Sequence, residues 1–491
     1  MTEATFNSPV ANALRDSFDT MISQLQAARD VIDTPSLYPV PEDDRNLAEG
    51  YRYLMGFVLG GIERALDDPM YPRFKRSIQP MNRSTIDNAD AVYLYAQIDG
   101  EHSYTLRGKA GDTSHWRGQP FAGDESSVPP RSRAPQYVIF ELCSGYSGDS
   151  GSLKEMRRGE RINTSVMDCH SIQVESDGTF EILIAPEKPT GFEGNFMLSK
   201  RESHGKEYVG RFLTLREIFH DWEKEDLLDL EIIRHGCENT PRPAITPDTA
   251  MEMMGEIGNY TNNHMRFWNA FNAVTLETYG KVPGGVDTGS DKPFMPTNDM
   301  NQPNALGIAT GGGQSTNVYA GGVYKLDDDE ALIIESIVPI KPSFLGFHLS
   351  NLWGESLDFE SYQSSLNTTQ MHVGEDGIYR WVVCHRDPGF LNWLDTSGLA
   401  HGYLTVRYTY AEKPPKEQWP TLEVKKVAFS EIANELPKDM AIADQATRDA
   451  MLQQLNAERA RRAQVTEAEG SKRAVELAAE AETRAPMGED I

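Results

Sequence analysis

The residues best suited to chemistry in this sequence are His385, Arg386 and Asp387, which stand directly before Pro388. They follow an apolar run typical of a buried strand, and strand ends that open into loops are common positions for binding groups. Together they could supply a titratable base, an anion clamp and an acceptor that orients the base. The competing interpretation is a structural turn in which Arg386 and Asp387 cap backbone groups.

A second group of polar and aromatic residues lies upstream, after another strongly apolar run. Trp353 and Glu355 are followed by Tyr362, Gln363 and Asn367. An aromatic wall with a few directional donors and acceptors is the usual composition of a pocket for an organic ligand. The alternative is a long loop in which the Trp353 ring fills the core and the polar groups bond to the loop's own backbone.

Further residues downstream are expected to close the other side of the same pocket, with the segment 283–313 as its cover. The hypothesis assigns catalysis to His385, Arg386, Asp387, Glu355 and Tyr362. It assigns substrate binding to Trp353, Gln363, Asn367, Asn392, Trp393, Asp395 and His401.

Metal and cofactor motifs are not evident in the sequence. There is no H-x-H, H-E-x-x-H or carboxylate cluster with the spacing of metal ligands. The acidic run 327–330 is best explained as a hairpin turn, and the glycine-rich segment 311–316 lacks the lysine of a phosphate-binding loop. Cys384 and His385 are not expected to act together, because neighbours in a strand point to opposite faces. We therefore expect neither a metal nor a cofactor.

The elements that must position these residues are predicted from hydrophobic periodicity. Apolar residues recur at helical spacing near the start, and from Val92 the period changes to two around an Asp99-Gly100 turn. The predicted fold is mainly β with helical additions (α+β), built on two tandem antiparallel β-sandwich or jelly-roll-like units. The expected parts are an N-terminal helical cap (1–86), a first β unit (87–212), a helical insert (213–282), a Gly/Pro-rich loop (283–314), a second β unit (315–412) and a linker with a C-terminal helical arm (413–491).

The two β regions resemble each other, which indicates an internal duplication. DGTFEILIAPEKP from Asp177 aligns with DGIYRWVVCHRDP from Asp376, and FELCS from Phe140 aligns with FHLSN from Phe347. The matching blocks occur in the same order. Because the second copy has His385 where the first has Pro186, the second unit is the predicted location of a site.

Composition restricts the class of protein further. The chain has 491 residues and a net charge of −27, which disfavours binding to nucleic acid or to anionic membranes. Its four cysteines contain no C-x-x-C pair, and the N-terminus lacks the pattern of a signal peptide. The sequence therefore predicts a cytoplasmic protein with neither a nucleic-acid nor a membrane partner.

The stretches DNADAVYLYAQIDGEHSYTLRG from Asp87, ALIIESIVPIKPSFLGFHLSNLWGESLDFESYQSSLN from Ala331 and HRDPGFLNWLDTSGLAHGYLTVRY from His385 carry a family resemblance. The chain resembles the bacterial family of domain of unknown function 1214. The resemblance implies β-sandwich or jelly-roll units with helical additions, often in homo-oligomers, and it supplies no activity or catalytic residues. The companion domain of unknown function 1254, which relatives often carry, is not evident here.

Two functions remain open. The first is a catabolic, cofactor-independent hydrolase, lyase or isomerase that acts on an apolar or polycyclic small molecule, with His385 as general base. The second is a non-catalytic small-molecule or carbohydrate-binding protein. Residues 440–485 contain good helix formers with a narrow apolar stripe, so we expect this arm to extend from the body and contact another subunit of a homo-oligomer.

Overall fold

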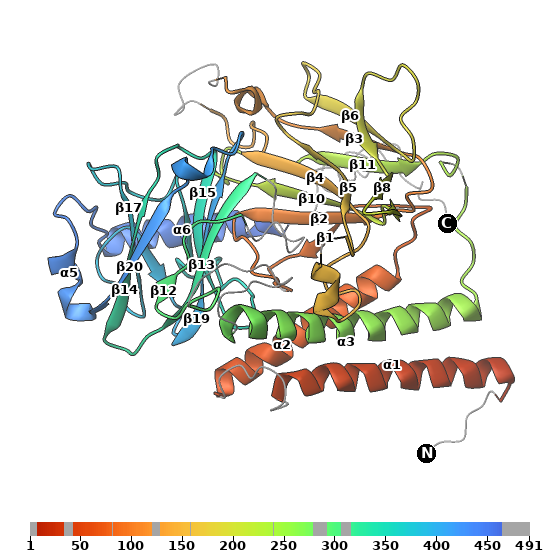
Figure 1. The fold of residues 1–491 in the computed structure, drawn as a ribbon, viewed down its shortest axis with the longest axis horizontal. Coiled ribbons are helices and arrows are strands. Elements are labelled where there is room, and N and C mark those ends of the chain that lie inside the picture. The colour runs from red at the N-terminus through yellow and green to blue at the C-terminus, as the bar shows by residue number, and fades with distance from the viewer. Residues whose placement is uncertain are drawn as a thin grey trace, which may run out of the picture.

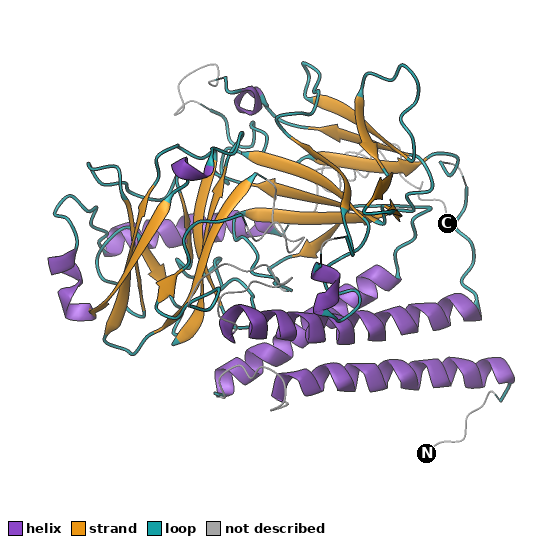
Figure 2. Cartoon of the chain, in the orientation of Figure 1, coloured by secondary structure: helices purple, strands orange, loops and turns teal. Residues whose placement is uncertain are grey.

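The computed structural model describes residues 7–33, 43–80, 82–119, 128–157, 159–238, 240–277, 292–305 and 316–463. Two β-sandwiches lie next to each other, and long helices cover one side of the pair (Figure 1, Figure 2). The predicted fold class, mainly β with helical additions, is confirmed. In the described part of the chain, no helix is long and apolar enough to cross a bilayer.

The first sandwich packs a five-stranded sheet against a four-stranded sheet. The larger sheet has the order β1 (Lys75–Ile78), β2 (Ala91–Gln97), β10 (Phe212–Ile218), β4 (Tyr137–Cys143) and β5 (Asn163–Asp168). The smaller sheet has the order β11 (Asp229–Arg234), β3 (Tyr104–Lys109), β6 (Thr179–Ala185) and β7 (Asn195–Leu198), and a separate hairpin is formed by β8 (Lys200–Ser203) and β9 (Lys206–Val209). Alternate apolar side chains of the strands meet between the two sheets and form one core.

The second sandwich is built in the same way. Its larger sheet has the order β12 (Asp299–Met300), β13 (Asn317–Lys325), β19 (His401–Thr409), β15 (Phe344–Ser350) and β16 (Ser365–Asn367). Its smaller sheet has the order β18 (Trp393–Asp395), β17 (Tyr379–Cys384), β14 (Glu330–Ile337) and β20 (Thr421–Ala428). Short helical turns connect other segments: η1 (Ser114–Arg117), η3 (Leu153–Met156), η4 (Lys416–Gln418), η5 (Phe429–Glu431) and α5 (Ile432–Glu435).

Strand order supports the internal duplication. β2, β10, β4 and β5 correspond in place and chain order to β13, β19, β15 and β16, and β3, β6, β7 and β11 correspond to β14, β17, β18 and β20. Each smaller sheet even contains the same single parallel pair, β6 with β7 and β17 with β18. The blocks that align in sequence therefore lie on equivalent strands.

The predicted helical insert over 213–282 is wrong in its first third. Residues 212–218 form β10 and residues 229–234 form β11, both of which belong to the first sandwich. Leu213 and Leu215 point into the core while Thr214 and Arg216 lie on the opposite face. This alternation is a strand pattern that the flanking aromatic residues obscured.

Two other predicted boundaries also change. β12 lies inside the segment predicted as a Gly/Pro-rich loop, and β20 lies inside the segment predicted as a linker. Both are edge strands of the second sandwich, where pairing with a neighbour determines the conformation more than local pattern does. Two parts of the predicted loop, 283–291 and 306–314, lie outside the described residues.

Three long helices form the layer beneath the sandwiches (Figure 1). They are α1 (Pro9–Asp33), α2 (Asp44–Ala65) and α3 (Pro247–Glu277), and α3 contacts both of the others. Asp43 caps α2 by accepting from the Asn46 N–H, and Thr246 with Pro247 begins α3 in the usual way. Glycine allows α2 and α3 to approach closely, because a Cβ at Gly61 would lie 3.1 Å from the Ile257 carbonyl oxygen.

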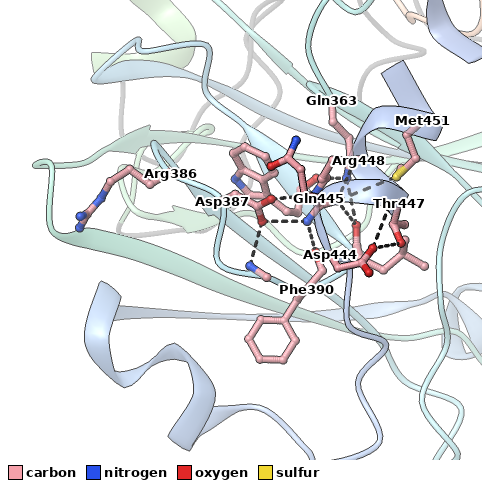
Figure 3. A network of polar contacts seen from close by, with 12 residues as sticks. Gln363, Arg386, Asp387, Phe390, Asp444, Gln445, Thr447, Arg448 and Met451 are labelled. Atoms are coloured by element: carbon pink, nitrogen blue, oxygen red, sulfur yellow. Dashed lines mark hydrogen bonds and ion pairs between the residues drawn. The ribbon is translucent and has the colours of Figure 1, made fainter. Parts of the chain in front are cut away.

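The C-terminal helix α6 (Gln445–Arg462) packs on its own chain, so the predicted extended arm is wrong for this part; residues 464–491 lie outside the described residues. Its first turn contacts the second sandwich through Arg448, which bonds to Asp387 and to the Gln363 amide oxygen (Figure 3). Its last turn reaches the first sandwich, where the Arg462 guanidinium lies 4.2 Å from the Trp222 ring. A helix with a narrow apolar stripe is expected to pack weakly. Helix α6 nevertheless packs on both sandwiches, because its contacts are made by arginines rather than by apolar side chains.

We predict that Arg462→Met strongly destabilises the fold. Arg462 is 3% exposed in its side chain and lies beside Asp90 and Glu458, which are 3% and 6% exposed. Removing the cation leaves buried carboxylates without compensation, which typically costs about 3–5 kcal/mol. Urea unfolding should measure a loss of that size.

Arg107→Met provides the matched control, because Arg107 forms ion pairs with Glu181 and Glu231 on the exposed surface. Exposed pairs contribute less than about 1 kcal/mol. Equal losses in the two variants would contradict the structural role assigned to Arg462.

Candidate functional site

His385 has a structural position at the end of β17. Its Nδ1 accepts from the Thr396 hydroxyl at 2.5 Å, and its Nε2–H donates to the Leu326 carbonyl at 3.2 Å. Both ring nitrogens are therefore occupied within the fold. A general base needs a nitrogen that can reach substrate, so the geometry removes His385 from that role.

The competing interpretation, a structural turn, is correct for Asp387, which caps a backbone group, whereas Arg386 packs on an aromatic ring. Arg386 lies 4.3 Å over the Phe429 ring and points away from the polar network around Asp387 (Figure 3). Asp387 accepts from the Gly389 N–H at 2.8 Å and from the Arg448 guanidinium at 2.9 Å. Partial burial raises the pKa of Asp387, but the bonds from Arg448 and Gly389 outweigh it and lower this pKa overall.

Asn392 is a fold residue, as the internal duplication shows directly. It donates to the carbonyls of His372 and Arg380 and accepts from the His372 N–H. At the equivalent place in the first sandwich, Asn195 donates to the carbonyls of Gln173 and Glu181 and accepts from the Gln173 N–H. Because both copies use the same three bonds, this asparagine holds a loop to the parallel strand pair.

Four of the other residues assigned to the second unit are likewise bonded to groups within the fold. Gln363 donates to the carbonyls of Leu391 and Trp393, and the Trp393 ring N–H donates to the Cys384 carbonyl. Similar local roles belong to Asn367, which accepts from Thr369, and to Asp395, which accepts from the Ser397 N–H. His401 begins β19, and burial lowers its pKa.

Trp353, Glu355 and Tyr362 do not meet in the predicted pocket either. Trp353 is buried against α2, where its ring N–H donates to the Asn46 carbonyl at 2.9 Å. Glu355 pairs with Arg52 at 2.9 Å, whereas Tyr362 is 45% exposed. The predicted set of twelve residues is therefore not brought together as one pocket.

The prominent cavity of the described structure lies instead between the two sandwiches. We call it the inter-sheet cavity; its volume is about 260 Å³. Its walls are the outer faces of the two five-stranded sheets, and α3 closes one side. None of the twelve predicted site residues lines it.

The two facing walls carry equivalent residues from the two copies. Arg216 of β10 is equivalent to Arg407 of β19. Arg216 pairs with Ile139 of β4, Arg407 pairs with Gly346 of β15, and these two partners occupy equivalent positions in the two copies. Thr214 then corresponds to Thr405, and all four residues line the inter-sheet cavity. Each arginine also lies 5.9 Å from a cavity tyrosine, Arg216 from Tyr93 and Arg407 from Tyr319.

The two arginines differ in their partners. Arg216 lies 3.6 Å from the Glu141 carboxylate, which also accepts from the Asn163 amide at 3.1 Å. Burial by itself would lower the pKa of Arg216, but the nearby Glu141 carboxylate raises it overall. At the position equivalent to Glu141 the second copy has His348, whose ring lies 2.8 Å from the Arg407 guanidinium.

Arg407 is consequently a buried cation whose carboxylate partner has been replaced by a neutral ring. Burial and the Arg407 charge hold the pKa of His348 well below its ordinary value. Arg407 is 9% exposed, its guanidinium also donates to the Ile86 carbonyl, and within the described residues it forms no ion pair. Asp87 contributes at longer range, but its carboxylate is bonded to the Ser356 N–H and hydroxyl.

Helix α3 supplies an aromatic wall with polar atoms set into it. Tyr260, His264, Phe267, Trp268 and Phe271 line the cavity at three-and-four spacing, which places them on one face of the helix. The His264 Nδ1 lies 2.9 Å from the Tyr260 carbonyl, so it carries the proton and donates. Burial lowers the pKa of His264 to about 4, which leaves the ring neutral near pH 7.

A sequence signal for this site existed in the duplication. The segment FLTLREI from Phe212 and the segment YLTVRYT from Tyr403 share the pattern L-T-x-R in equivalent strands. The predicted helical insert over 213–282 includes the first of these segments and so hid the match. In the described residues no group of three or more His, Cys, Asp or Glu side chains is arranged to bind a metal.

Comparison with solved structures supports the fold. An uncharacterized protein from Burkholderia cenocepacia matches with a TM-score of 0.66 and 20% identity, over 86% of this chain and 100% of that chain. A protein from Vibrio parahaemolyticus matches with a TM-score of 0.38 and 11% identity, over 82% of this chain and 100% of that chain, a likeness too low to support an argument. No family model and no curated protein matches the chain.

We predict that the His264 ring stays neutral at pH 5. Its pKa in the folded protein is about 4, below the ordinary value of 6.5, so the unfolded chain takes up the proton first. The stability that depends on the neutral ring is complete above about pH 6.5 and declines as the pH falls toward 4.

Histidine-ring NMR of labelled protein, with His264→Gln to assign the signal, should measure this. A His264 signal that titrates near pH 6.5 would contradict the buried, neutral ring.

Proposed function

We propose that this protein binds a small, mainly apolar organic molecule with an anionic group in the inter-sheet cavity. The aromatic residues of α3 and the tyrosines of both sheets would contact the apolar body of the ligand. A volume of about 260 Å³ suits a small molecule rather than a polymer. The anionic group would bind at Arg407.

The observation that carries this proposal is the pairing of the two equivalent arginines. Arg216 has Glu141 as its counter-ion, whereas Arg407 faces the cavity beside the neutral His348. A buried guanidinium without a carboxylate is costly to hold in a protein, and a ligand anion would offset that cost. Arginine also suits the planar, bidentate binding of a carboxylate.

Binding is favoured over the acid–base enzyme that the sequence suggested. The proposed base of that enzyme, His385, uses both ring nitrogens within the fold. Arg386 and Asp387 belong to a surface turn and to the α6 contact. A catalytic function would need a different set of residues from the one first assigned.

We predict that the protein binds 2-naphthoate and that Arg407→Met weakens this binding about ten- to a hundredfold. Hydrogen bonds to a charged group contribute about 1.5–3 kcal/mol, and 1.4 kcal/mol corresponds to a factor of ten. Titration calorimetry would measure the affinity. The neutral analogue 2-naphthamide should bind wild type and variant equally, which also shows that the variant keeps its cavity.

His348→Glu provides a second, matched variant that keeps the arginine. It gives Arg407 the partner that Arg216 already has, so the affinity for 2-naphthoate should fall while the affinity for 2-naphthamide is retained. If wild-type protein fails to bind 2-naphthoate, or if both variants bind it as wild type does, the proposed anion site is wrong.

Three broader expectations from the sequence stay proposals. A homo-oligomer is supported by a row of exposed apolar residues on α2 and its C-cap, namely Tyr51, Met55, Leu59, Ile62 and Leu66, because such rows are often buried by association. Membership of the family of domain of unknown function 1214 is supported by the resemblance described above. A cytoplasmic location is supported by the four cysteines, none of which forms a disulfide, because free cysteines are usual in a reducing compartment.

A further inference from the structure

Two residues of α3 that line the inter-sheet cavity, His264 and Trp268, each have a buried polar atom without a hydrogen-bond partner among the described residues. These atoms are the His264 Nε2 and the Trp268 Nε1. Both atoms are buried, and His264 as a residue is only 3% exposed. Buried polar atoms in proteins are nearly always hydrogen-bonded, so each needs an explanation at this position.

The two atoms have opposite hydrogen-bonding character. Because the His264 Nδ1 carries the proton and donates to the Tyr260 carbonyl, its Nε2 has a lone pair and accepts. The indole Nε1–H of Trp268 can only donate. Residues four positions apart lie on one face of a helix about 5–6 Å apart at their Cβ atoms, so the two side chains are neighbours on the face of α3 that lines the cavity.

The surrounding residues fix the His264 ring in this arrangement. The ring stacks on Tyr260 with centroids 3.8 Å apart and lies beside Phe57. Gly148, with φ of +107°, leaves room for it, because a Cβ there would lie 2.7 Å from the His264 Cδ2. The acceptor is thus preorganised rather than free to rotate away.

We propose that the ligand carries a hydroxyl group that binds between His264 and Trp268, in addition to its anionic group. A hydroxyl oxygen accepts from the Trp268 N–H while its proton is donated to the His264 Nε2. A carboxylate would satisfy only the tryptophan and would face the histidine lone pair. This inference rests on the proposed function and narrows the ligand class to hydroxylated apolar acids.

The test compares 2-naphthoate with 6-hydroxy-2-naphthoate and 7-hydroxy-2-naphthoate by titration calorimetry on the full chain. Wild-type protein should bind at least one hydroxylated probe about tenfold or more tightly than 2-naphthoate. In Trp268→Phe and in His264→Phe this preference should fall below about twofold. Each preference is the ratio of two affinities measured on the same variant, so a general weakening of binding by the altered cavity wall does not count as loss of the preference.

The outcomes separate this inference from the proposed function. Equal binding of all three probes by wild-type protein would overturn the hydroxyl site and leave the anion site standing. A hydroxyl preference that persists in both variants would also overturn the assignment to His264 and Trp268. If none of the three naphthoates binds, both the proposed function and this inference are wrong.

Discussion

The structure depends on how two copies of one sandwich bury the same charged face against each other. Each copy already has its own core between its two sheets, but the outer face of its larger sheet carries an arginine and a threonine in the pattern L-T-x-R. When these faces oppose each other, Arg216 and Arg407 enter one cavity. Two like charges in a space with little water repel strongly, so each arginine needs a counter-ion, either from the fold or from a ligand.

The two copies place different side chains beside their arginines. The first retains Glu141 beside its arginine, and Asn163 holds that carboxylate in place. The second has His348, which is buried and neutral, at the equivalent position. A duplication allows this kind of division, because one copy can keep a structural ion pair while the other leaves a cation available to a ligand.

The helices follow from the same arrangement. The cavity would be open along one side without α3, which covers it with aromatic residues and is held from below by α1 and α2. At the other side of the molecule α6 crosses from Asp387 of the second sandwich to Trp222 of the first through Arg448 and Arg462. Both elements fix the separation of the two sandwiches, and that separation determines the size of the cavity.

The sequence by itself determined the fold class, the long N-terminal helices and the alignment of the two β regions, because these depend on hydrophobic period and turn residues within single elements. It misplaced edge strands β12 and β20, whose conformation depends on a neighbouring strand. It also misplaced the site: the groups at His385 are chemically capable, but their bonds to Thr396, Leu326 and Arg448 exist only after folding. Contacts between residues far apart in the chain determine which polar atoms are hydrogen-bonded within the fold and which face a cavity. For that reason Asn392 could not be separated from a ligand residue by type alone. The L-T-x-R pattern marks Arg407 and Arg216 as equivalent, but only the tertiary structure brings both to one cavity.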